Sequence, residues 1–121
     1  MNKIINDICF DLDKCPVKAT LDVIGGKWKT MIIYLISNDI NRFGKLSMVL
    51  RDISKQMLTS QLRELENDGI VQRVIYPEIP PRVEYFLTER GKSLLPVIAQ
   101  MSHWGTVNVF GKAPEVAMEA V

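Results

Sequence analysis

The chain has 121 residues and a formal net charge of +1, and 47% of its residues are hydrophobic. That composition supports the core of one domain and excludes a disordered tail. No apolar run approaches the roughly 20 residues of a membrane-spanning helix, and acidic residues near the N-terminus interrupt any signal-peptide core, so we expect a soluble cytoplasmic protein without membrane contact.

The N-terminal part of the chain is predicted to form an arm and three helices. Residues 1–14 form the arm, where apolar residues at helical spacing indicate a short helix. The first helix begins at Cys15-Pro16, because proline is tolerated at the first helical position, and ends at Gly25-Gly26. A second helix, buried on most sides, is predicted over Trp28 to Ile36, and a third over Arg42 to Leu50. The residues expected to face the core from the first and third helices are Val17, Leu21, Ile24, Phe43, Leu46, Val49 and Leu50.

The stretch from Ile53 to Arg73 is predicted to begin as a helix and to lead into a hairpin. Ser54 is placed to cap this helix, and Leu58, Leu62 and Leu65 share one buried face. The turn over residues 51–53 joins it to the preceding helix as a helix-turn-helix. The polar side carries side chains suited to base edges and phosphates, namely Lys55, Gln56, Thr59, Ser60, Arg63 and Asn67. The alternative is an ordinary amphipathic helix with a solvated face.

Charge is segregated along this part of the chain. From Arg42 to Arg63 there are five bases and one acid, a local balance of +4, whereas residues 64–69 contain three acids and no base. Bases before acids is the order that the helix dipole disfavours, so helix stability alone does not explain it. A local basic surface can bind a polyanion even when the total charge is close to zero.

After Gly69 the apolar pattern changes to that of strands. Two strands are predicted over Ile70 to Tyr76 and Arg82 to Leu87, where β-branched and aromatic residues are frequent. The loop over 77–81 holds three prolines, which cannot donate ladder hydrogen bonds, so we expect it to project from the sheet. Thr88 is predicted to cap a long helix that runs from Glu89 toward Phe110, and Pro96 either kinks it or obscures its start. Residues 111–121 are expected to form a short helix or a frayed tail.

These elements are the parts of a winged helix-turn-helix, an α+β, mainly α fold. Three segments, CPVKATLDVIGGKWK (15–29), RFGKLSMVLRDISKQMLTSQLRELENDGIVQR (42–73) and YPEIPPRVEYFLTERGKSLLPV (76–97), closely resemble the HxlR-type bacterial transcriptional regulators, a MarR-like branch of winged-helix proteins. The resemblance implies one winged-helix DNA-binding domain over residues 1–121, with an N-terminal arm (1–14), an HxlR-type core (15–105) and a C-terminal extension (106–121). It also implies a two-stranded β wing and a long C-terminal dimerisation helix.

By the same resemblance, the protein is expected to bind an inverted repeat of double-stranded DNA as a homodimer, with repression as the default. The DNA-binding residues implied by position are Ser54, Lys55, Gln56, Thr59, Ser60 and Arg63 on the helix and Arg82 on the wing. Their chemistry separates them further. Gln56 and Arg63 can make bidentate contacts to base edges, whereas the remaining helix residues suit phosphates.

Cysteine chemistry leaves two interpretations of Cys15. The two cysteines, Cys9 and Cys15, are too few for a secreted disulfide scaffold and lack zinc-site spacing, so both are expected to be free thiols. Several HxlR-type regulators sense oxidants or electrophiles through a cysteine at the position of Cys15. A helix N-terminus and nearby lysines would favour its reactive thiolate; the alternative is a buried structural cysteine. Cys9 is either a resolving thiol or incidental.

No residue spacing indicates a catalytic site, a metal site or a cofactor loop, so neither an enzyme nor a bound cofactor is expected. The sequence predicts a dimeric DNA-binding regulator controlled by thiol chemistry or by a small-molecule or electrophile effector. The alternative is a winged-helix protein-interaction module without DNA binding. The local balance of +4, together with Arg63 and Arg82, favours the regulator.

Overall fold

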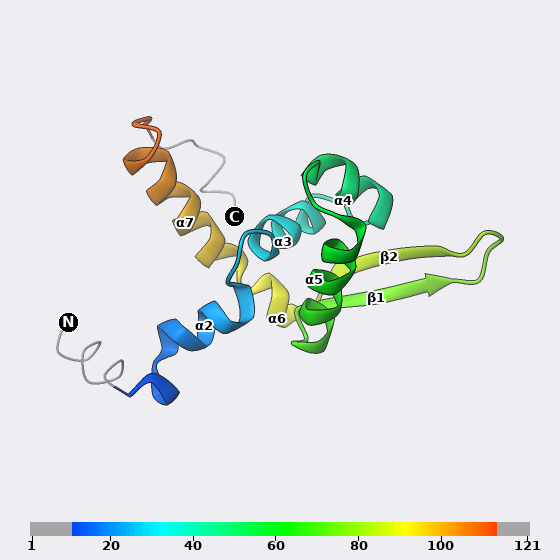
Figure 1. Cartoon of the computed structure of the whole chain (residues 1–121), viewed down its shortest axis with the longest axis horizontal. Coiled ribbons are helices and arrows are strands. Elements are labelled where there is room, and N and C mark those ends of the chain that lie inside the picture. The colour runs from blue at the N-terminus through cyan, green and yellow to red at the C-terminus, as the bar shows by residue number, and fades with distance from the viewer. Residues whose placement is uncertain (1–10, 114–121) are drawn as a thin grey trace.

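The structure is a computed structural model that describes residues 11–113. Its elements follow the predicted order (Figure 1): a 3-10 turn η1 (Leu12–Lys14), helices α2 (Pro16–Ile24), α3 (Lys29–Ser37), α4 (Phe43–Leu50) and α5 (Lys55–Asn67), strands β1 (Val71–Tyr76) and β2 (Arg82–Leu87), and helices α6 (Glu89–Lys92) and α7 (Leu95–Asn108). The predicted mainly α fold with a two-stranded wing is confirmed. Within this part of the chain, no helix is long and apolar enough to cross a membrane.

The core lies where α3, α4 and α5 meet the start of β1. Helix α5 contributes Leu58, Leu62 and Leu65, all buried as their spacing predicted. They pack in one cluster with Ile32 and Ile33 of α3. Burying each such aliphatic side chain is worth about 1.5–3 kcal/mol, so this cluster supplies much of the stability and holds α5 with its polar side outward.

The turn between α4 and α5 is sharp and locally specified. Helix α4 ends at Arg51, whose φ of 55° lies in the left-handed region, and a non-glycine residue there costs free energy that packing must offset. Ser54 then caps α5 as predicted, since its side-chain oxygen accepts a hydrogen bond from the backbone N–H of Met57 at 3.0 Å. Such a cap is worth about 1 kcal/mol.

The wing is an antiparallel hairpin that points away from the helices (Figure 1). Its register runs from the pair Val71 and Leu87 to the pair Tyr76 and Arg82. The proline-rich loop continues beyond the paired residues, and Ile79, the middle residue of 77–81, is fully exposed. At the base, the backbone N–H of Tyr85 donates to the carbonyl of Asn41 at 2.9 Å, which ties β2 to the segment before α4.

Several apolar residues that were expected in the core are exposed. Val17 and Leu21 on α2 are more than half exposed, and only Ile24 of the predicted stripe is buried; on α4, Val49 is 47% exposed. Helix α3 buries one side rather than most of its circumference, because Met31 and Tyr34 face outward. The physical reason is that apolar spacing identifies a face but does not reveal whether the same chain covers it.

The predicted long terminal helix is divided into α6 and α7. Thr88 caps α6 as predicted, accepting from the backbone N–H of Gly91 at 3.0 Å. Pro96 lies in the first turn of α7. In a continuous helix its ring would clash with the carbonyl of Lys92, where α6 ends. The break therefore explains why the sequence left the helix start ambiguous.

Helix α6 is joined closely to the chain between α5 and β1. Gly91 lies directly on the Ile70 carbonyl, where a Cβ atom would overlap the backbone. Thr88 donates its backbone N–H to Ile70 O at 3.1 Å, and Arg90 Nε donates to Asp68 O at 3.0 Å. The segment 88–91 and the segment 68–70 thus form one packed unit. The expectations for the arm up to residue 10, for Cys9 and for residues 114–121 lie outside the described residues.

Candidate DNA-binding surface

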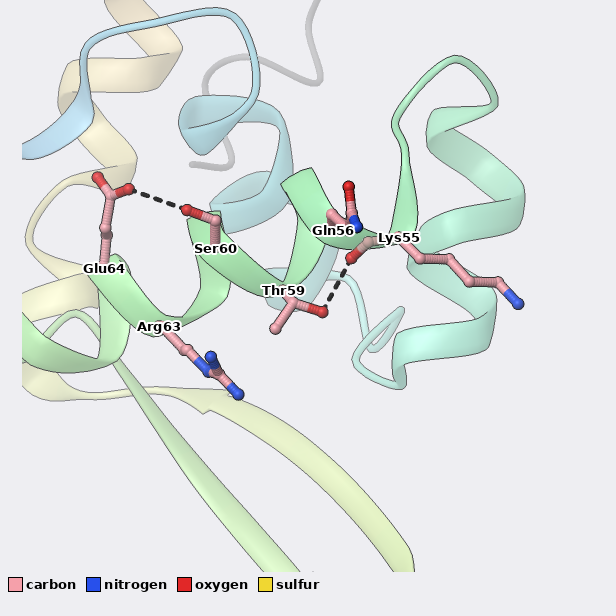
Figure 2. Close-up of a pocket in the computed structure, with 6 residues that line it drawn as sticks. All are labelled: Lys55, Gln56, Thr59, Ser60, Arg63 and Glu64. Atoms are coloured by element: carbon pink, nitrogen blue, oxygen red, sulfur yellow. Dashed lines mark hydrogen bonds between the residues drawn. The ribbon is translucent and has the colours of Figure 1, made fainter.

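The polar side of α5 forms an open hollow on the surface. Figure 2 shows the side chains that line it, all from this one helix: Lys55, Gln56, Thr59, Ser60, Arg63 and Glu64. Five of these six are residues predicted to bind DNA. Among the ion pairs within residues 11–113, none includes Lys55 or Arg63, so both cations are open to a polyanion.

The hydroxyl groups on this surface are already engaged. Thr59 donates to the backbone carbonyl of Lys55 at 2.8 Å, and Ser60 donates to Oε2 of Glu64 at 3.3 Å (Figure 2). A phosphate oxygen accepts hydrogen bonds and cannot donate them, so either hydroxyl must turn before it can bind a phosphate. Ser54 differs, because its oxygen accepts in the cap and its proton remains to be donated.

Glu64 links α5 to the core through a buried lysine. Its Oε1 accepts a hydrogen bond from Nζ of Lys29 at 2.7 Å; the Lys29 side chain is 7% exposed and that of Glu64 is 51% exposed. The hydrogen bond from Lys29 and its positive charge hold the pKa of Glu64 below its usual value, with a smaller contribution from Ser60. The Glu64 carboxylate therefore accepts hydrogen bonds from two side chains, those of Lys29 and Ser60.

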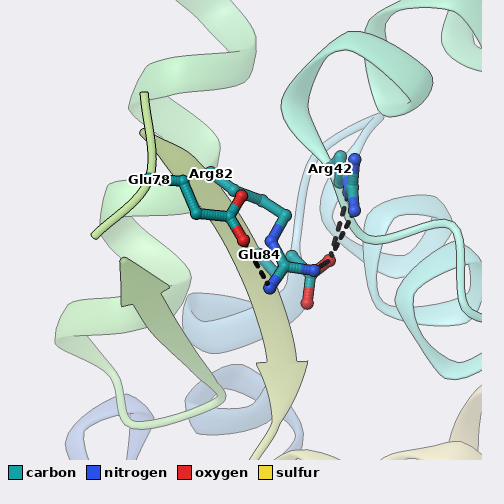
Figure 3. Close-up of polar contacts among 4 residues, drawn as sticks. All are labelled: Arg42, Glu78, Arg82 and Glu84. Atoms are coloured by element: carbon teal, nitrogen blue, oxygen red, sulfur yellow. Dashed lines mark hydrogen bonds and ion pairs between the residues drawn. The ribbon is translucent and has the colours of Figure 1, made fainter. Parts of the chain in front are cut away.

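The predicted wing residue Arg82 lies within a network of charges (Figure 3). Its guanidinium is 3.3 Å from a Glu78 oxygen and 3.5 Å from a Glu84 oxygen, and it stacks 3.9 Å from the ring centroid of Tyr76. Glu84 also pairs with Arg42 at 3.0 Å. The two arginines and two glutamates have no net charge, so this part of the wing presents less positive potential than the polar side of α5, where Lys55 and Arg63 lie outside the ion pairs of the described residues. The Nε of Arg82 is buried and has no hydrogen-bond partner among the described residues.

Cys15 lies at the N-cap of α2, as predicted, but it is not a free thiol. It is 6% exposed and disulfide-bonded, and the described part of the chain contains no free cysteine. The expectation of free thiols is wrong for Cys15, because composition cannot reveal which cysteines the fold brings together. Within residues 11–113, no cluster of three or more His, Cys, Asp or Glu side chains could hold a metal ion.

A family model for the HxlR-like helix-turn-helix matches residues 23–112. The chain belongs to this family. Its relative YybR, an uncharacterized HTH-type transcriptional regulator of Bacillus subtilis (strain 168), is 51% identical over 94 residues, which cover 78% of this chain and 75% of YybR. The HxlR-like resemblance in the sequence motifs is thereby confirmed.

Two solved structures of regulators are similar to this HxlR-like chain. The redox regulator HypR in its oxidized form has 52% sequence identity and a TM-score of 0.72, over 78% of this chain and 97% of HypR. The reduced form of the transcriptional regulator YodB from B. subtilis has 33% identity and a TM-score of 0.69, over 81% of this chain and 97% of YodB. The protein is a transcriptional regulator of the HxlR, MarR-like type, and regulators of this type bind DNA; the family is not one of enzymes.

The sequence predicted most of the residues on the polar side of α5 but missed the charged residues that contact this side or the wing. In the sequence Glu64 is only one of three acids in residues 64–69, whereas in the structure it lines the same hollow as Ser60. Lys29 and Glu84 were assigned no role, and Arg42, counted among the bases of the +4 segment, is paired with Glu84. The spacing of Ser60 and Glu64 by four residues could have signalled their bond. The Lys29 contact, 35 residues away along the chain, had no local signal.

Proposed function

We propose that this chain acts in the cytoplasm as a homodimeric repressor that binds an inverted-repeat operator and is controlled by thiol oxidation or electrophiles at Cys15. The observation that carries the DNA-binding part is the polar side of α5, where Lys55 and Arg63 are exposed outside any ion pair of the described residues while Leu58, Leu62 and Leu65 fix the opposite side in the core. A rigid helix with free cations and amide groups matches the major groove.

Each candidate residue is given a role by its chemistry. Gln56 and Arg63 read base edges, since an amide and a guanidinium can each form two parallel bonds to one base. Ser54 and Lys55 bind phosphates near the helix N-terminus, where the dipole also attracts anions. Thr59 and Ser60 contribute hydroxyl groups, and Arg82 contacts the backbone from the wing by exchanging a carboxylate partner for a phosphate.

The proposed dimer is supported by the exposed apolar side of α7. This helix has 14 residues and buries none of them. Val97, Met101 and Trp104, at spacings of four and three residues, are 40%, 49% and 62% exposed. Helices α2 and α7 both lie at the end of the molecule opposite the wing (Figure 1). An exposed apolar helix side of this kind fits a second copy of the chain.

The proposed control at Cys15 is supported by its place at the N-cap of α2 and by the names of its neighbours HypR, a redox regulator, and YodB, whose diamide-treated form is also similar to this chain. Oxidation joins Cys15 to a second thiol. The two thiols lose two electrons and two protons, and diamide accepts these electrons and protons and becomes the hydrazine. Because Cys15 is disulfide-bonded in this structure, an electrophile would act only after the disulfide is reduced to two thiols; it would then form a covalent bond to the Cys15 sulfur, with loss of the thiol proton.

DNA binding is tested with duplexes selected by the wild-type protein from a random-sequence library, and with the promoter next to its own gene. We expect a mobility shift of both that is lost at high salt, because phosphate contacts release counterions. No shift at low salt, with a folded dimer in hand, would instead favour a winged-helix protein-interaction module.

The control is tested by measuring the same shift with the reduced protein, before and after diamide treatment. We expect diamide to change DNA binding by the wild type. The response of Cys9→Ser and of Cys15→Ser should differ from that of the wild type. If Cys15→Ser responds as the wild type does, Cys15 is not the sensor.

A further inference from the structure

A buried lysine supports the candidate recognition surface from behind. Lys29 is the first residue of α3, and its ammonium reaches Oε1 of Glu64 at 2.7 Å on α5. The side chain is 7% exposed. Both features disfavour a cation: burial removes hydration, and the N-terminal end of a helix carries the positive end of the dipole. An apolar residue in such a place is often as stable or more so, so stability alone does not account for this lysine.

The bond to Lys29 determines what Glu64 can do. One carboxylate oxygen is taken by the ammonium, and the other accepts the hydroxyl proton of Ser60 at 3.3 Å. Figure 2 shows the Glu64 carboxylate turned along the helix toward Ser60. The Ser60 oxygen then keeps its lone pairs for the hollow in front of α5 but has no proton to donate there.

We infer that Lys29 is a positioning residue that acts through Glu64 to hold Ser60 as a hydrogen-bond acceptor facing the DNA. An acceptor is repelled by phosphate oxygens and matches an amino group on a base edge, either N4 of cytosine or N6 of adenine. Ser60 is thus a base-reading residue for an amino group rather than a phosphate contact. This inference rests on the proposed function and assigns part of its sequence preference.

The bond from Lys29 also offsets the negative charge of Glu64. Without Lys29, Glu64 would be an unpaired, half-exposed carboxylate on the surface that faces DNA. Its repulsion would weaken binding to every duplex alike, because it acts on the phosphates. The preference for a selected duplex over a random one separates this general effect from the loss of one base contact.

The test measures dissociation constants of the purified full chain, at fixed salt, for a duplex that the wild type selects from a random library and for a random duplex. In Lys29→Met, which removes the buried charge at similar side-chain length, we expect the preference to fall about tenfold, the usual effect of losing one base contact. Ser60→Ala should show the same fall. Both changes break the same series of contacts from Lys29 through Glu64 to Ser60. The double variant Lys29→Met/Ser60→Ala should therefore lose little more of the preference than either single variant.

The matched control is Lys92→Met, which removes an equal charge from the exposed pair with Glu89 on α6 and should keep the preference. Circular dichroism shows whether each variant is folded; if Lys29→Met is not, Glu64→Ala breaks the same series of contacts from its half-exposed side. An unchanged preference in folded Lys29→Met, or fully additive losses in the double variant, would overturn the positioning role. A wild type without preference for any sequence would instead overturn the proposed function itself.

Discussion

Helices α5 and α7 have nearly the same length but opposite burial. Helix α5 has 13 residues and buries three leucines in the core, while its other side is polar. Helix α7 has 14 residues and buries none, while a side that includes Trp104 is apolar and exposed. In α5 the folded monomer covers the apolar side; in α7 it partly buries Leu95 and Ile98 against the core and leaves the side with Trp104 exposed.

The difference indicates two kinds of partner for one chain. A helix whose apolar side is buried in the core can present its polar groups to a charged ligand, and the core fixes its position. A helix whose apolar side is not satisfied gains free energy only when a second surface covers it. The comparison predicts that changes in α5 act on folding and on DNA binding, whereas changes in α7 act on assembly.

The largest expected effect is on folding. Leu62→Ala removes a side chain that is 1% exposed and should lower the free energy of unfolding by about 2–5 kcal/mol. Met101→Ala on α7 is the matched truncation and should cost less than about 1 kcal/mol in the monomer, because its site is already half exposed. Urea unfolding at low protein concentration measures both. Equal losses would remove the contrast between the two helices.

The next effect concerns assembly. Trp104→Glu places a charge in the exposed apolar side of α7 and should raise the dimer dissociation constant at least about a hundredfold, as for other buried aromatic anchors. Met48→Glu, on α4 and 75% exposed, introduces the same charge elsewhere and should leave the dimer intact. Sedimentation equilibrium distinguishes them. A dimer that survives Trp104→Glu would place the interface away from α7.

A third effect is confined to DNA binding. Arg63→Ala should weaken binding to the selected duplex by about 1–3 kcal/mol, the usual value of a bidentate contact to a base. Binding to random DNA should weaken less, and the unfolding free energy should hardly change, because Arg63 is exposed. Fluorescence anisotropy at fixed salt measures both duplexes, with Lys92→Ala as the control for lost charge. Equal weakening on the two duplexes would leave Arg63 as a phosphate contact.

The smallest effect is on the pH dependence of stability. The Lys29–Glu64 bond lowers the pKa of Glu64 from its usual 4.5, so the bond stabilises the fold above that pH and its contribution is lost as pH falls through the lowered value. The stability difference between wild type and Glu64→Gln should be constant from about pH 6 to 8 and should shrink in acid. Urea unfolding across pH measures it. A stability difference that does not shrink in acid would contradict this account of the Lys29–Glu64 bond.

Local patterns were enough to predict the helix-turn-helix and the wing. Ser54, the leucines of α5 and the prolines of the wing loop each act over a few residues, so their roles follow from spacing and backbone geometry. Contacts made by the fold were not predictable in this way. The approach of Lys29 to Glu64, the pairing of Arg42 with Glu84 and the exposure of Val17 depend on how distant segments pack, and no periodicity encodes that.

The close contact of α6 with the start of β1 couples the position of α6 to that of α5. Because the Gly91 backbone touches Ile70, and Arg90 is bonded to Asp68, we expect a rotation of α6 to move the C-terminal end of α5 with it. A helix of 13 residues is about 20 Å long, so a rotation of about 10° at that end moves its other end by about 3.4 Å. That displacement is about the rise of one base step in DNA, so in the proposed complex a small change in angle at this contact would be enough to shift Lys55 and Gln56 from one base pair to the next.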